Sequence, residues 1–77
     1  PMQAGLPHWV HVKVNPLAEA RIRHGNFILP EDLLDVPKPL TVGEDVVLLN
    51  IEGDVLALAE IKRTNRLICQ PFRVFME

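Results

Sequence analysis

Two groups of basic side chains are the residues of this chain whose types and spacing could do chemistry. The first lies in residues 20–28, ARIRHGNFI, and the second lies in residues 62–73. Cationic side chains next to a glycine and an asparagine can hold an anion, because glycine permits close approach and the polar groups donate hydrogen bonds. The candidate anion-binding residues are Arg21, Arg23, His24, Gly25, Asn26, Lys62, Arg63, Arg66 and Arg73.

The distribution of charge along the chain differs from its average. The net charge of the 77 residues is −2, which by itself argues against a nucleic-acid partner. Residues 1–30 hold three Lys or Arg against one acid, residues 31–60 one against eight, and residues 61–77 four against one. If the two basic ends meet in the fold, they form a patch that the net charge conceals.

Each candidate also has a purely structural interpretation, and the sequence leaves both open. The stem of Arg21 can cover apolar surface, and His24 can interact with the dipole at a helix C-terminus. Gly25 is needed to stop the helix whatever the function. Lys62 and Arg63 can be charges that protect an edge strand from aggregation.

Two further side chains bear on this choice. Glu19 and Arg23 are four residues apart and predict an ion pair, which leaves Arg21 and His24 without a local partner. Trp9 can stack on a base, but packing in the core or against another domain is the favoured interpretation.

The residue types needed for catalysis are largely missing. The chain has no Ser and no Tyr, and Cys69 lies in an apolar strand pattern typical of a buried thiol. His8 and His11 would point to opposite faces of a strand, so they cannot share a metal ion. No glycine-rich phosphate loop is present. We therefore expect a non-catalytic chain with no cofactor and no metal.

The elements that position these residues can be read from the pattern. Residues 1–7 predict a linker, and residues 8–77 predict one folded domain. Residues 8–14 alternate as a half-buried strand, with Val10, Val12 and Val14 on one face. Asn15 and Pro16 predict the start of a helix that runs to about His24.

The rest of the chain predicts mostly strands. We expect a short strand at 26–29, a helical turn at 30–34, a loop at 35–41, a hairpin with its turn at Gly53, and a last strand from Leu67. Pro71 places that last strand near an edge or bulge. Continuous apolar runs at 46–49 and 55–59 indicate burial on both faces. The predicted fold is mixed α/β but mainly β, a small pseudo-barrel with one principal capping helix.

The cellular compartment is predicted from three features that the sequence lacks: a membrane-spanning run, a signal peptide and a disulfide. No apolar run approaches the ~20 residues that span a bilayer, and no signal peptide precedes the first strand. The single Cys69 excludes an internal disulfide. We expect a cytoplasmic protein without a membrane partner.

The order of motifs resembles a known family. LAEARIRHGNFI, VGEDVVLLNIEGDVLALAEI and RLICQPFRVF together resemble the C-terminal PUA domain of the bacterial tRNA pseudouridine synthase B family, over about residues 10 to 75. The shared features are Arg23-His24-Gly25, Gly53, Ala59-Glu60, and Leu67 to Val74 with Pro71 and Arg73. The family more often has Gly where this chain has Ala59, and Cys69-Gln70 is inserted before Pro71.

This resemblance implies a PUA-like barrel that grips tRNA near its acceptor stem. It also implies that the uridine-isomerising aspartate lies in a separate catalytic domain of the parent chain, an isomerase active in tRNA processing. The partners implied are tRNA and that catalytic domain. The alternative is a protein-interaction or regulatory PUA-like module attached to another enzyme.

Overall fold

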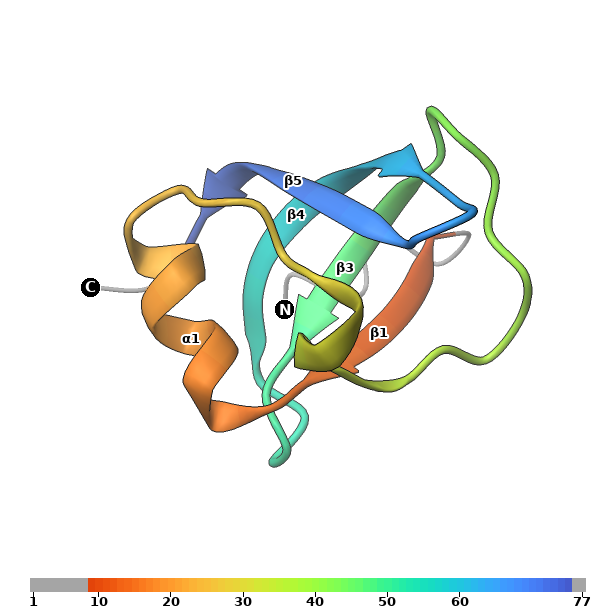
Figure 1. The fold of residues 1–77 in the computed structure, drawn as a ribbon. Coiled ribbons are helices and arrows are strands. Elements are labelled where there is room, and N and C mark those ends of the chain that lie inside the picture. Colours follow the sequence, from red (N-terminus) through yellow and green to blue (C-terminus); the bar gives the residue numbers. More distant parts are fainter. Residues whose placement is uncertain (1–8, 76–77) are drawn as a thin grey trace.

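Five strands in one curled sheet, with a helix across one end, make up the fold (Figure 1). The computed structural model describes residues 9–75, so the predicted linker at 1–7 lies outside the described residues. The elements in order are β1 (Val10–Val14), α1 (Pro16–Arg23), the 3-10 turn η2 (Pro30–Asp32), β2 (Leu33–Asp35), β3 (Asp45–Leu49), β4 (Val55–Arg63) and β5 (Ile68–Val74). The sheet order is β2-β1-β3-β4-β5. The mainly-β fold with one capping helix is confirmed.

Strand β1 shows the predicted alternation. Val12 and Val14 are buried while Lys13 between them is exposed, because successive side chains of a strand point to opposite faces. β1 pairs in parallel with β3. Parallel strands need a long connection, and here α1, η2 and β2 all lie within it.

The β3–β4 hairpin carries the turn that the sequence predicts. The side-chain oxygen of Asn50 accepts the backbone N–H groups of Glu52 and Asp54, each at 2.9 Å. Gly53 has φ +92°, a conformation that other residues rarely adopt. The turn therefore depends on an Asn and a Gly placed three residues apart.

The segment after α1 closes the sheet towards a barrel. Ile28 and Cys69 of β5 exchange two backbone hydrogen bonds of 2.8 and 3.0 Å. From there η2 leads into β2, which pairs antiparallel with β1. The strand expected at 26–29 is thus a single bridge at Ile28. The helical turn expected at 30–34 ends at Asp32, because the next three residues pair with β1, a long-range contact that no local pattern announces.

Buried apolar side chains form two clusters, one on each face of the sheet. The larger fills the barrel and includes Ala18 and Ile22, which lie four residues apart on α1 and close one end. The smaller contains Val47, Leu49 and Leu58 on the outer face. Burial of β3 and β4 on both faces is therefore confirmed. No helix in residues 9–75 is long and apolar enough to cross a membrane.

Candidate nucleic-acid interface

The end of α1 presents the first basic group. The helix begins where Asn15 Oδ1 accepts the N–H of Ala18 at 2.9 Å. It ends at Arg23, and Gly25 just beyond it has φ +72° and donates its N–H to Ile22 O at 3.0 Å. The predicted cap and stop are both confirmed, and they turn the chain from the helix towards β5.

Three polar side chains at this turn are exposed. Arg23, His24 and Asn26 all face solvent. Within residues 9–75 none of them makes a side-chain hydrogen bond or ion pair, so the predicted pair of Glu19 and Arg23 is wrong. Arg23 is therefore available to a ligand.

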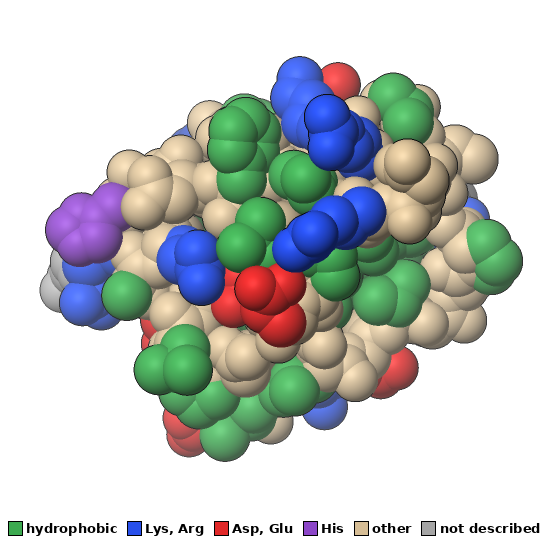
Figure 2. All heavy atoms as spheres, in the orientation of Figure 1, with side chains coloured by type: hydrophobic (Ala, Val, Ile, Leu, Met, Phe, Trp, Pro, Cys, Tyr) green, Lys and Arg blue, Asp and Glu red, His purple; other side chains and the backbone are tan. Residues whose placement is uncertain are grey.

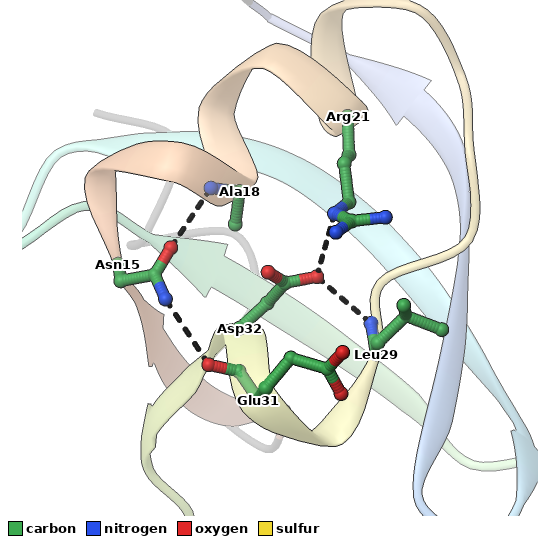
Figure 3. Close-up of polar contacts among 6 residues, drawn as sticks. All are labelled: Asn15, Ala18, Arg21, Leu29, Glu31 and Asp32. Carbon is green, nitrogen blue, oxygen red and sulfur yellow. Dashed lines mark hydrogen bonds and ion pairs between the residues drawn. The ribbon is translucent and has the colours of Figure 1, made fainter.

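Arg21, by contrast, has a partner inside the fold (Figure 3). Its Nε lies 3.1 Å from Oδ2 of Asp32, whose residue is only 2% exposed. The same oxygen accepts the N–H of Leu29 at 3.0 Å. Arg21 was expected to lack a local partner; its actual partner, Asp32, lies eleven positions further along the chain, in η2. Its guanidinium ties the helix to the turn.

A second contact ties η2 to the start of the helix. Asn15 Nδ2 donates to the carbonyl oxygen of Glu31 at 3.1 Å (Figure 3). The loop between α1 and η2 is also held by β5, since Gln70 Nε2 donates to Gly25 O at 3.3 Å. The loop that carries Asn26 is thus anchored at both ends.

The loop and the end of β4 together enclose an open hollow of about 270 Å³. We call it the basic hollow, and its lining residues are Phe27, Leu29, Lys62, Arg63 and Ile68. Figure 2 shows basic side chains on both sides of a group of hydrophobic side chains on this face, with acidic side chains beside them. The second basic segment contributes Lys62 and Arg63 to this lining, whereas the first contributes only Phe27; the side chains of Arg21, Arg23 and His24 do not line the hollow.

A distortion of β4 brings Lys62 and Arg63 to the same place. Neighbours in a regular strand point to opposite faces. The register of β4 and β5 shifts between Ile61 and Arg63, and this irregularity accompanies the lining of one hollow by two consecutive side chains. Lys62 Nζ lies 3.4 Å from Glu60 Oε1. Both side chains are nearly half exposed, so this pair is weak and leaves Lys62 able to bind an anion.

Arg66 and Arg73 take different positions. Arg66 is exposed in the turn between β4 and β5, three positions after Arg63 of the basic hollow. Arg73 lies near the other end of β5, with its guanidinium carbon 5.4 Å from the centre of the Phe75 ring. Phe75 packs on the outer cluster, so Arg73 stands apart from Lys62 and Arg63.

Trp9 belongs to the outer cluster as well. Its ring is tilted against that of Phe72, with centroids 6.3 Å apart, and it packs on Val47, Leu49 and Leu58. Packing on the sheet, the interpretation favoured from sequence, is what the structure shows for Trp9.

Sequence reasoning missed the apolar part of the basic hollow. Phe27, Leu29 and Ile68 had been assigned only to strands. A signal was available for Phe27, because it alternates with the buried Ile28 and must therefore face away from the core.

Two titratable groups in residues 9–75 have clearly shifted pKa values. Cys69 is fully buried, and this burial raises the pKa of its thiol to about 11, so the predicted buried thiol is confirmed. The pKa of Glu44 is lowered, first by the backbone N–H of Thr41 and also by Lys38. Among residues 9–75 no three His, Cys, Asp or Glu side chains lie close enough to hold a metal ion. His8 is outside that range.

Solved structures identify the class of fold as that of a PUA domain. A conserved PUA domain protein from Thermoplasma acidophilum matches 90% of this chain and 51% of its own, with a TM-score of 0.76 and 14% identity. A chain of an H/ACA RNP bound to a substrate RNA containing 2′-deoxyuridine matches with a TM-score of 0.87 and 19% identity, over 100% of this chain and 27% of its own. A chain of the archaeal box H/ACA sRNP Nop10-Cbf5 complex gives 0.83 and 18%, over 99% and 27%.

The sequence itself is similar to tRNA pseudouridine synthase B of Oleidesulfovibrio alaskensis. The two are 37% identical over 67 residues, which cover 86% of this chain and 21% of that protein. The resemblance predicted from the motifs is thereby confirmed. The chain spans about a fifth of the length of this curated relative. No family model matches the chain.

Proposed function

We propose that the chain is an RNA-binding accessory domain that helps to hold tRNA for a pseudouridine synthase. The observation that carries this proposal is a hollow lined by Lys62 and Arg63, next to the loop that follows the basic end of α1, in a chain whose net charge is −2. The relationship to tRNA pseudouridine synthase B supports RNA as the partner over a second protein. In this proposal uridine isomerisation belongs to a catalytic domain, and the present residues position the substrate.

Binding would depend on phosphate contacts. Lys62, Arg63, Arg66 and Arg23 are exposed cations, and His24 and Asn26 supply further donors. Contacts of this kind fix the orientation of an RNA backbone without reading its sequence. Arg21 would support this surface from beneath, through Asp32.

At least three of the eight carboxylates in residues 31–60 are engaged within the fold. Asp32 is buried against Arg21, and Glu44 pairs with Lys38 at 3.4 Å. Asp54 is part of the hairpin turn, which it shares with Asn50. These carboxylates serve the fold, which supports a basic face on a mildly acidic molecule.

The identity of the RNA and the compartment belong to the same proposal. We propose tRNA as the RNA and the cytoplasm as the location, since a single reduced thiol at Cys69 fits a reducing compartment. Most of the affinity of a whole synthase would come from joining this domain to its catalytic domain, which raises the effective concentration of each binding surface.

A titration of tRNA with the double variant Lys62→Ala, Arg63→Ala tests the proposal. Each lost phosphate contact should reduce the slope of log affinity against log salt by about 0.9 on a duplex stem. The double variant should therefore bind more weakly at low salt, and its slope should be flatter by about 2. Different tRNAs should lose similar amounts, because phosphate contacts are independent of sequence.

The matched control is Lys13→Ala, Lys38→Ala, which removes the same charge from exposed positions that do not line the hollow. Equal losses in the two variants would mean that only net charge matters. Unchanged binding by the Lys62, Arg63 variant, with its fold intact by circular dichroism, would reject RNA binding at this face and favour the protein-interaction alternative.

A further inference from the structure

The basic hollow combines apolar walls with charged rims. Phe27 is 51% exposed although it is a large aromatic residue, and Leu29 and Ile68 are only partly buried beside it. Lys62 and Arg63 line the same hollow. A site that binds only phosphates needs no exposed aromatic ring. The lining of this hollow therefore fits a ligand that has an apolar group covalently joined to an anionic group.

The backbone groups of Ile28 and Leu29, in the loop wall, are already engaged within the fold. Ile28 donates to Cys69 and accepts from it. The N–H of Leu29 is bound by Asp32 Oδ2 at 3.0 Å, and its carbonyl oxygen accepts the N–H of Asp32 at 2.9 Å. Ile28 and Leu29 therefore have no free backbone N–H to donate to a ligand, and Leu29 lines the hollow mainly as apolar contact surface.

We infer that the basic hollow binds an unpaired nucleobase on the ring of Phe27, with a neighbouring phosphate on Lys62 and Arg63. This inference rests on the proposed function and adds which part of the RNA the hollow takes. Bases inside a duplex are stacked and paired, so only an unstacked base can lie on an aromatic side chain. Since stacking requires only a π-face, the hollow accepts any base.

Binding of single-stranded and duplex RNA by the 77-residue chain separates this inference from general phosphate binding. The probes are a uridine strand and an adenosine strand of about ten nucleotides, each with one fluorescent 2-aminopurine, and a blunt hairpin of similar charge. Phe27→Ala should lower affinity for both strands about 5-fold or more, because base stacking on an aromatic ring is lost. Affinity for the hairpin should stay unchanged.

The salt dependence distinguishes the ring from the cations. Phe27→Ala removes no charge, so the slope of log affinity against log salt should be retained. The 2-aminopurine signal that reports stacking should disappear in Phe27→Ala and persist in Phe72→Ala. Phe72 is the matched control, because it is similarly exposed, at 54%, and lies on β5 against Trp9.

The outcomes separate the two proposals. If the unaltered chain binds RNA but Phe27→Ala, still folded, binds strands and hairpin as the unaltered chain does, the inference is overturned while RNA binding stands. Equal losses for strands and hairpin overturn it as well. If the unaltered chain binds none of these RNAs at low salt, the proposed function itself fails. If Phe27→Ala lost affinity for only one of the two strands, the claim that the hollow accepts any base would be overturned.

Discussion

Arg21 and Arg23 show how two identical side chains, two residues apart, acquire different roles. Arg21 points to η2 and pairs with the buried Asp32, whereas Arg23 is exposed and has no ion-pair partner within residues 9–75. The sequence pattern of the helix predicted the reverse, because the i, i+4 spacing of Glu19 and Arg23 is visible locally and the contact to Asp32 is not. A buried carboxylate that accepts a backbone N–H outweighs an exposed helix pair worth only tenths of a kcal/mol.

Asp32→Ala should destabilise the fold by about 1–3 kcal/mol, because it leaves the N–H of Leu29 without its acceptor in a part-buried place. Arg21 adds less to this loss because its side chain is 42% exposed. Urea unfolding of both proteins measures the difference. The control is Glu31→Ala, whose exposed side chain neighbours Asp32; an equal loss there would contradict a specific role for Asp32.

Cys69 makes stability depend on pH in the alkaline range. Its thiol has a pKa of about 11 in the fold and 9.0 as the ordinary value, so the folded state holds the proton more tightly. Between pH 9 and 11 the thiol ionises in the unfolded state before it ionises in the fold. The free energy of unfolding is therefore fully retained below pH 9 and falls by up to about 3 kcal/mol as pH rises through 11. Unfolding free energies at pH 8 to 11 should fall more steeply for the unaltered chain than for Cys69→Ala. Parallel curves would show that the thiol does not contribute.

At the scale of elements, local signals predicted what local interactions make. The Asn15 cap, the Gly25 stop and the Gly53 turn are each made by residues within four positions of one another, and all were predicted. β2 was missed because its pairing with β1 joins residues about twenty positions apart. The basic residues of the candidate site were predicted from charge, while its aromatic wall, Phe27, required the bridge between loop and β5.

Gly25 follows the end of α1 and belongs to the candidate site. Its role in stopping the helix can be measured by stability alone. Gly25→Ala should destabilise the fold by about 1–2 kcal/mol, because φ +72° is unfavourable for a residue with a Cβ. No atom lies within 4 Å of the added Cβ, so no clash adds to this cost. Gly25→Asn should cost less, since Asn tolerates this conformation. Thermal unfolding of the three proteins measures both, and equal stability of all three would contradict the strain.

At the scale of the whole molecule, two surfaces differ in chemical character. One surface carries the basic hollow, which is lined by the loop to η2 and by the β4–β5 end, with exposed cations beside apolar side chains (Figure 2). The outer face carries Trp9, Phe72 and Phe75 on a small apolar cluster. The first surface is the one proposed to bind RNA, and the second is mainly apolar.

This division predicts different roles for two arginines that the sequence placed in one set. Arg66→Ala should weaken RNA binding and flatten the salt slope by about 0.9, because Arg66 lies in the turn beside Arg63. Arg73→Ala should leave both unchanged, because its guanidinium lies over Phe75 on the outer cluster. Salt titrations of both variants with one tRNA make the comparison at equal net charge. An equal effect of the two would mean that the RNA reaches the far end of β5, and the RNA-binding surface would then extend beyond the basic hollow to the C-terminal part of the sheet.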